Sequence, residues 1–427
     1  MVLRIDTKRI MRILYNILIL WPFIQQRTYA DAPLIVGKVY KYCMIASSLI
    51  ILVFEGRKIG RVKQQKHLIW FLLFTGTYLF STLLFMRGSM FYVSYHMFGY
   101  MAVAMFISIK LDENADELMT ALSFIYGAFI FLNFITDIMY PQGLYKARTS
   151  GYHAAHLLGD DNALIYVILP GIICMVCSSL KKYQRIRWYV WLAMIVSEYT
   201  LIKIWSASAM VCLFLTIVMI IYMIHLGRFN PKLLLVGTVL AILGAFLATS
   251  SPFIKKFVED ILHKDITFHG RASLWAQAYD MFRNNPVLGT GGYYQNGSFL
   301  INQYSTTHYP SHTPFLQIMI DGGAIALAFF VIITVKGYIN TARNKGNFGA
   351  CVLAIGMTCM LINYITEHAE FHHFVIIAVL MLKVEAIGMP DQYKRKRFFK
   401  KKYKSLDMEL LNRSRGLNDD RQAGTPS

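Results

Sequence analysis

Charged residues are scarce in this sequence: they make up 16% of its 427 residues, while hydrophobic residues make up 56%. An average soluble domain carries about 25% charged residues, so this composition excludes a soluble globular protein of this length. Apolar runs of about 17–25 residues, the length needed to cross a hydrocarbon core as a helix, recur along nearly the whole chain. We therefore predict an all-α, polytopic membrane protein.

The sequence also lacks the common motifs of metal and nucleotide chemistry. It has no H-E-x-x-H pattern, no Asp-x-Asp pair of the kind that holds a nucleotide-sugar metal, and its GTGG at 289–292 lacks the frame of a phosphate loop. All six cysteines fall in apolar runs, where small core residues are more frequent than metal ligands or disulfides. We therefore expect neither a metal nor a cofactor.

The first apolar run is not followed by an A-x-A-like cleavage site, which argues against a cleaved signal peptide.

Acidic residues are outnumbered by basic ones, 24 to 43, which gives a net charge of +19. In a membrane protein the first explanation is an excess of Lys and Arg in cytoplasmic loops, and nucleic-acid binding is the weaker one. The segment KRKRFFKKKYK at 394–404 is expected to contact anionic lipid headgroups. We divide the chain into one membrane domain, 1–390, and a basic cytoplasmic tail, 391–427, which we expect to be disordered.

Twelve apolar segments are predicted to span the membrane. They lie at 11–26, 34–54, 68–86, 90–109, 118–140, 162–180, 188–204, 206–226, 233–250, 313–335, 349–366 and 371–389. Basic residues gather in alternate connections, and the positive-inside rule then places both termini in the cytoplasm. The two longer connections, 141–161 and 251–312, fall outside. Nine of the twelve histidines lie outside or at outer helix ends in this topology, which indicates polar chemistry on that side.

The connection at 251–312 is far longer than an ordinary helix connection, and it contains a predicted helix of its own. Its apolar stripe consists of Leu274, Trp275, Ala278, Met281 and Phe282 at helical spacing. The helix follows Gly270 and ends at Asn284-Asn285-Pro286. We expect this helix to lie flat on the outer membrane surface, so that the large extracytoplasmic loop contains an interfacial helix.

The residues around this helix carry a family resemblance. The sequence GRASLWAQAYDMFRNNPVLGTGG…SHTPFLQIMIDGGAIAL, at 270–327, resembles the superfamily of O-antigen ligases and Wzy-type O-antigen polymerases. In that superfamily a GR-x-x-x-W helix, a P-x-x-G-x-G turn and an H-N-x-[FYL]-L…E-x-G segment flank one large extracytoplasmic loop. The matching residues are Arg271, Trp275, Pro286, Gly289, Gly291, His312, Phe315, Leu316 and Gly323.

The resemblance is strongest over 145–370, with some departures. Upstream, Arg148, Gly151 and Asn162 are similar to an R-x-x-G…N-x-x-A segment of the family. The asparagine after the family's histidine is Thr313 here, and the glutamate before its glycine is Asp321. A frequent Ser-Arg-Gly reads Ser-Ala-Ser at 206–208, so any basic role there needs another residue.

The resemblance implies a GT-C-like glycosyltransferase of the bacterial cytoplasmic membrane that uses an undecaprenyl-diphosphate-linked glycan on the outer face. Such a donor needs a cationic clamp for its diphosphate, and the planar guanidinium group of arginine suits phosphate oxygens. We assign Arg148 and Arg271 to this clamp, with Arg283 and Lys203 as further candidates. For Lys203, extension of its ammonium group to the membrane interface is an equally good explanation.

His312 is the candidate catalytic base, acting beside Arg271. A neutral imidazole near pH 7 can take the proton from an acceptor hydroxyl as that oxygen attacks the anomeric carbon. Two other roles stay open for His312, as a donor to the diphosphate and as a cap of the following helix. His308 and His153 are candidate contacts to the diphosphate or the glycan.

The favoured reaction is polymerisation of lipid-linked repeat units of an O-antigen, capsule or exopolysaccharide, with inversion at the anomeric carbon. The closest alternative is a ligase that moves the glycan to a different acceptor, and a non-enzymatic glycan transporter is a weaker one. A flippase and a chain-length regulator are candidate protein partners.

His368 and His372 are spaced i, i+4 in the outer turn between the last two spans. For the histidines of this turn we favour a wet rim, a solvent-exposed edge of the acceptor cleft, over a metal site.

Overall fold

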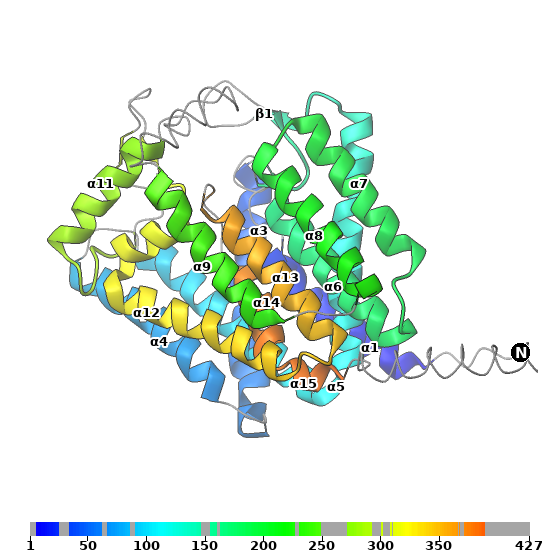
Figure 1. The fold of residues 1–427 in the computed structure, drawn as a ribbon. Coiled ribbons are helices and arrows are strands. Elements are labelled where there is room, and N and C mark those ends of the chain that lie inside the picture. The colour runs from blue at the N-terminus through cyan, green and yellow to red at the C-terminus, as the bar shows by residue number, and fades with distance from the viewer. Residues whose placement is uncertain are drawn as a thin grey trace, which may run out of the picture.

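The computed structural model is almost entirely helical (Figure 1). It describes residues 6–24, 34–61, 66–85, 90–146, 154–159, 163–226, 230–248, 271–292, 300–301, 308–309, 311–365, 367 and 371–388. The α-helices are α1 (Thr7–Ile24), α3 (Leu34–Ile50), α4 (Lys66–Phe85), α5 (Met90–Met139), α6 (Ile165–Tyr183), α7 (Trp188–Ile204), α8 (Ala207–Leu226), α9 (Pro231–Ala248), α11 (Arg271–Asn284), α12 (Pro314–Arg343), α13 (Phe348–Asn363), α14 (His372–Leu382) and α15 (Val384–Ile387).

Short elements complete the described chain. A π-helical turn, η1 (Ile51–Glu55), and a 3₁₀-helix, η2 (Gly56–Arg61), extend α3. Strands β1 (Tyr145–Lys146) and β2 (Ala154–Ala155) form one antiparallel pair, and β3 (Leu300–Ile301) and β4 (His308–Tyr309) form another. The basic tail at 391–427 lies outside the described residues.

The predicted all-α, polytopic membrane class is confirmed. Each of the twelve predicted segments coincides with helix over most of its described length. Among the described residues, six helical stretches are long and apolar enough to cross a membrane: Ile35–Gly60, α4, α5, α6, α8 and α12. Shorter apolar helices occupy Pro231–Ala245, α13 and α14. The number of twelve spans therefore stays a prediction.

Helix α5 shows how the acidic connection KLDENADE divides two predicted spans. Its 50 residues would extend about 75 Å if straight, more than twice the hydrocarbon thickness. Asn114 has non-helical backbone angles, φ −162° and ψ 90°. Its Oδ1 accepts hydrogen bonds from the backbone N–H groups of Asp116, at 3.2 Å, and Glu117, at 3.4 Å. Asn114 therefore acts as an N-cap that starts the second half of α5.

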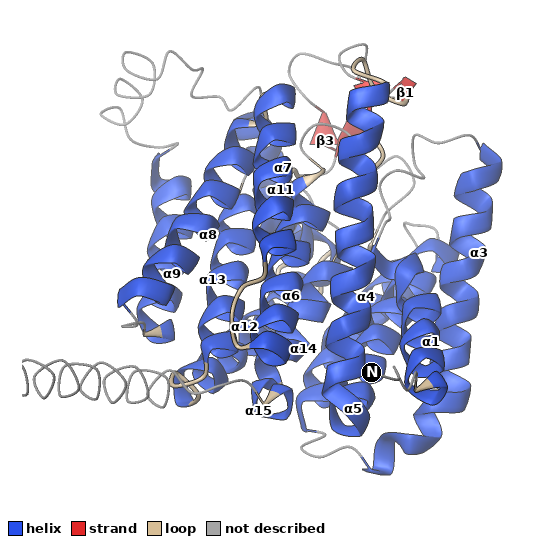
Figure 2. Cartoon of the chain, turned by 90° about the vertical axis from the view of Figure 1, so that its right-hand side faces the viewer, coloured by secondary structure: helices blue, strands red, loops and turns tan. Residues whose placement is uncertain are grey.

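The helix ends sort into two groups at opposite ends of the molecule. At one end, Arg12 near the start of α1 pairs with Glu117 at 2.7 Å. At the same end, Lys181 in the last turn of α6 pairs with Asp116 at 3.2 Å and donates to the carbonyl of Ile387 at the end of α15. At the other end lie β1 and β3, from the two longest predicted outer connections (Figure 2). This grouping fits the predicted alternation of the spans, and which end faces the cytoplasm stays a prediction.

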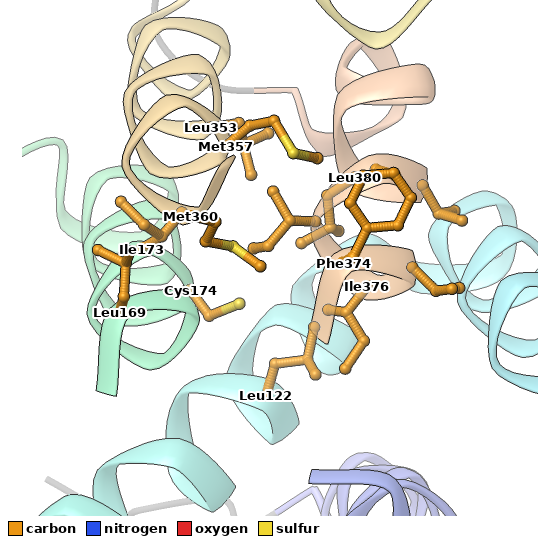
Figure 3. Packing of buried hydrophobic residues seen from close by; sticks show 14 of the residues in the cluster. Leu122, Leu169, Ile173, Cys174, Leu353, Met357, Met360, Phe374, Ile376 and Leu380 are labelled. Atoms are coloured by element: carbon orange, nitrogen blue, oxygen red, sulfur yellow. The ribbon is translucent and has the colours of Figure 1, made fainter. Parts of the chain in front are cut away.

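The core centres on α14, every residue of which is buried. A helix that is hydrophobic all round must be covered on all sides, and α5, α6, α12 and α13 supply that cover. Ile376 and Leu380 of α14 lie toward Leu122, Cys174 and Met360 from three of these helices (Figure 3). The ring of Phe374 stacks on that of Phe330 in α12, with 4.5 Å between the ring centroids. Cys174 thus has the role of a small core residue, as its position in an apolar run predicts.

Four charged side chains form a closed ring beside the Asn114 kink. Glu55 pairs with Lys58 at 2.9 Å and with Lys110 at 3.0 Å, and Glu113 pairs with the same two lysines at 3.0 and 2.7 Å. The ring lines a pocket of about 560 Å³. It joins η1 and η2 to the middle of α5, so it fixes the kink relative to α3.

Replacing Glu55 with glutamine should lower the free energy of unfolding by roughly 3 kcal/mol, because it leaves Lys110 buried with one partner fewer. Asp116→Asn is the matched control: its carboxylate also pairs with a lysine, but it is 57% exposed, and the loss should stay below about 1 kcal/mol. Thermal unfolding of both variants in detergent measures the difference. Equal losses would show that the ring does not stabilise the fold.

Candidate functional site

The P-x-x-G-x-G turn at 286–291 packs against a break in α12. At Gly323 the helix takes φ 68° and ψ −168°, so α12 consists of a short first half and a longer second half. The turn supplies hydrogen bonds across this break: Thr290 N donates to Ile320 O at 2.6 Å, and Ala324 N donates to Pro286 O at 2.8 Å. Backbone groups released by the broken helix are thereby satisfied inside the protein, as an apolar environment requires.

Glycine is needed on both sides of this contact. A Cβ at Gly289 would lie 2.3 Å from the carbonyl oxygen of Ile320, and a Cβ at Gly323 would lie 2.2 Å from that of Val287. Both glycines also have positive φ, 70° and 68°, which L-residues with side chains seldom adopt. Gly289 and Gly323, two glycines of the family pattern, thus allow one close contact between the backbone of the turn and that of α12.

Helix α4 holds the far side of the turn. The Ser81 hydroxyl donates to the carbonyl of Leu288 at 2.5 Å, and the Thr82 hydroxyl accepts from Gly292 N at 3.0 Å. Both side chains are buried. The turn is therefore fixed between the last residues of α4 and the break in α12.

The predicted helix at 271–284 is present as α11, but its apolar stripe has a different neighbour from the one expected. Leu274, Trp275 and Ala278 form a buried cluster with Leu316 and Ile320 in the first half of α12. Protein rather than lipid covers this stripe. A position of α11 at the outer membrane surface stays a prediction.

His312 lies directly before α12, in a segment anchored on both sides. The indole Nε1 of Trp275 donates to the carbonyl of Ser311 at 3.0 Å, and Ser311 N donates to Oε1 of Gln317 at 3.1 Å. His312 is partly buried and has a left-handed backbone, φ 54°. The N-cap position of α12 belongs to the next residue, Thr313. Trp275 thus binds the residue directly before His312.

A second polar cluster joins the ends of α5 and α7. Nδ1 of His156 donates to Oδ1 of Asp137 at 2.8 Å, and Nδ2 of Asn133 donates to Oδ2 of Asp137 at 2.8 Å. All three side chains are buried. The ammonium group of Lys203 donates to the backbone carbonyl of Asp137 at 2.7 Å. Lys203 therefore holds the end of α5, which gives this predicted site residue a structural contact.

Asp137 and Asn133 are polar residues that the sequence reading placed inside an ordinary span. Their i, i+4 spacing near the end of an apolar helix was the available signal, because a polar pair there needs a partner.

Asp137→Ala should destabilise the protein by about 3 kcal/mol, since it leaves His156 and Asn133 buried without the carboxylate that accepts their hydrogen bonds. Asp280→Ala, at an exposed site on α11, is the control and should change the thermal unfolding midpoint little. Similar midpoints for both would contradict this assignment.

The structure describes only some of the remaining predicted site residues. Arg283 is exposed on α11. Arg271 is the first residue of α11 and His308 lies in β4, but their side chains are outside the described part of the structure. Arg148 and His153 lie outside the described residues altogether. The arginine clamp stays a prediction.

The histidines of the last predicted outer turn do not all form a wet rim. His372 and His373 are buried at the start of α14, and Nδ1 of His373 lies 2.9 Å from the hydroxyl of Tyr126. His372 packs with the rings of Phe23 and Tyr100. Because these side chains belong to the core, the rim interpretation is wrong for both. His368 lies outside the described residues. The described part of the chain contains no group of three or more side chains suited to a metal ion.

This is a polytopic membrane protein with a broken helix, α12, which has a histidine just before its start and a glycine turn packed against its break. Residues 192–331 match the family model described as O-antigen ligase, a segment that includes Lys203, Trp275, the turn, His312 and the break at Gly323. Over this segment, the match confirms the predicted resemblance to the superfamily of O-antigen ligases and polymerases. No curated protein sequence matches the chain significantly.

Proposed function

We propose that this protein is a membrane glycosyltransferase that polymerises a bacterial surface polysaccharide. It transfers an undecaprenyl-diphosphate-linked glycan to a hydroxyl group of another lipid-linked repeat unit at the outer face of the cytoplasmic membrane. The observation that carries the proposal is the way both ends of the first half of α12 are held, within the segment that matches the O-antigen ligase family model. Trp275 binds the residue directly before His312 at its start, and the glycine turn packs against the break at its end.

The reaction we propose is a single displacement. The acceptor oxygen attacks the anomeric carbon, His312 takes the hydroxyl proton, and the bond from the anomeric carbon to the diphosphate oxygen breaks. Undecaprenyl diphosphate leaves with the bonding electrons, and the configuration inverts. Neutralising the leaving group is the task proposed for Arg271 and Arg148, because guanidinium groups bind phosphate oxygens in pairs without a metal ion.

The remaining candidate contacts belong to the donor and the acceptor. Lys203, Arg283, His308 and His153 are proposed to bind the diphosphate or the glycan. A flippase that delivers the donor and a chain-length regulator are the proposed protein partners, and the basic tail at 391–427 is proposed to contact anionic lipid.

A ligase is the second candidate, because the matching family model is described as O-antigen ligase. The two functions share the donor and the chemistry, and they differ only in the acceptor. A transporter role would need no proton acceptor at position 312, so loss of glycan transfer in His312 variants separates it from both enzymes.

The test is synthesis by the purified protein in lipid vesicles that contain an undecaprenyl-diphosphate-linked repeat unit. A ladder of lipid-linked polymers, made without metal or nucleotide, is the expected product. Transfer to a different acceptor lipid or protein, with no ladder, would replace the polymerase with the ligase. Movement of the donor between leaflets without any new glycosidic bond would overturn both enzyme assignments.

A further inference from the structure

The backbone of His312 is held in an uncommon conformation. Its φ of 54° lies in the left-handed region, where residues with a side chain are infrequent and strained. Such a conformation persists only when the surrounding contacts determine it. The question is which side chains impose it, and whether they serve the chemistry at His312.

The contacts act on the residues that flank His312. Ser311 is fully buried; its N–H donates to Oε1 of Gln317 at 3.1 Å, and its hydroxyl donates to the carbonyl of Thr313 at 2.8 Å. Gln317 N also donates to the Thr313 carbonyl at 3.1 Å. The two residues that flank His312 are therefore both bound to Gln317, one turn into α12: Ser311 N–H to its side chain and the Thr313 carbonyl to its backbone N–H.

The direction of the Gln317 amide is set by Asp321. Nε2 of Gln317 donates to Oδ1 of Asp321 at 2.9 Å, across the i, i+4 spacing of the helix. The backbone N–H of Ser311 can only donate, so the amide turns its oxygen toward Ser311 and its NH₂ group toward Asp321, whose Oδ1 accepts and so holds this direction. Both side chains are buried, at 5% and 1% exposure, so no solvent competes for these bonds. Asp321 itself precedes the break at Gly323 that the glycine turn secures.

We propose that Gln317 is a positioning residue for His312, and that Asp321 acts through Gln317 by fixing the direction of its amide. Neither side chain needs to touch substrate. The pair holds the left-handed backbone that aims the imidazole ring at the acceptor hydroxyl. This inference rests on the proposed role of His312 as the proton acceptor in glycan transfer.

The experiment is a double-mutant cycle in the purified, vesicle-embedded protein. Gln317→Met keeps the length of the side chain and removes both hydrogen bonds, and it should lower kcat about 100-fold with KM little changed, because misplacement of a catalytic group acts mainly on the chemical step. In a protein that already carries His312→Asn, the same change should lower the residual rate no further, since the group that it positions is gone.

Two further variants separate positioning from general stability. Asn340→Leu removes two side-chain hydrogen bonds from the other half of α12, to the carbonyls of Met381 and Leu382, and should leave kcat unchanged. Asp321→Asn removes the carboxylate that fixes the amide direction and should lower kcat about tenfold, whereas Asp321→Glu, which restores the carboxylate, should recover it. The Asp321 pair keeps the test valid if Gln317→Met does not fold.

The outcomes distinguish the inference from the function on which it rests. If His312→Asn retains wild-type transfer, the proposed role of His312 fails and the positioning role with it. If His312→Asn lowers transfer as expected but Gln317→Met keeps its kcat, or lowers the rate by the same factor in both backgrounds, the positioning role alone is overturned. A loss of kcat in Asn340→Leu equal to that in Gln317→Met would also overturn it.

Discussion

Replacement of His312 with asparagine should lower kcat for glycan transfer by about 10²–10⁴-fold, the usual contribution of a positioned general base. Asparagine tolerates the left-handed φ of 54° better than most residues, so the local backbone should survive the change. Its amide can still donate a hydrogen bond but cannot take a proton near neutral pH. Initial rates of transfer from an undecaprenyl-diphosphate-linked glycan, with the purified protein in vesicles, give the measurement.

The division of the effect between kcat and KM separates the roles open to His312. Loss of kcat at constant KM supports the base, whereas a higher KM at constant kcat would instead support a hydrogen bond from His312 to the donor diphosphate. His225→Asn, at an exposed position on α8, is the matched control and should transfer glycan at the wild-type rate. A His312→Asn protein as active as this control would contradict both roles.

Much of the helical framework follows from the sequence, because hydrophobic periodicity and run length are local properties. The helix at 271–284 begins and ends as the pattern predicts. The acidic connection in α5 also shows its effect locally, since Asn114 caps the helix that follows it. What periodicity does not reveal is what covers an apolar face. The stripe of α11 would suit lipid or protein equally, and only the tertiary fold brings α12 against it.

The sequence predicts the residue types of the candidate site, but not which of these residues contact one another. The sequence pattern marks Gly289 and Gly323 separately, whereas their mutual backbone contact joins positions 34 residues apart and has no local signature. The same holds for His156 and Asp137, which lie in different predicted segments and are joined by a hydrogen bond next to the β1–β2 strand pair. Hydrogen bonds between distant polar side chains depend on the exact approach of whole helices, which composition does not encode.

Substitution of Gly323 by alanine should destabilise the protein by roughly 2–6 kcal/mol, the sum of a strained backbone and an overpacked contact. The added Cβ would lie 2.2 Å from the carbonyl oxygen of Val287 and 2.6 Å from the backbone nitrogen of Gly289. Because these are backbone atoms, no side-chain rotation relieves the clash. The turn must separate from the α12 break, and the hydrogen bonds that join them must lengthen. The thermal unfolding midpoint in detergent and the yield of monodisperse protein measure the loss.

Gly76→Ala is the matched control, because a Cβ at Gly76 of α4 meets no atom within 4 Å. Alanine in a helix interior is favoured over glycine by about 1 kcal/mol, so this variant should be as stable as the wild type or slightly more stable. The same change, Gly to Ala in a helix, should therefore have opposite signs at the two positions. A Gly323→Ala protein that unfolds at the wild-type temperature would show that the turn and the broken helix separate without cost. Transfer by that variant would then show whether the turn is needed to hold His312.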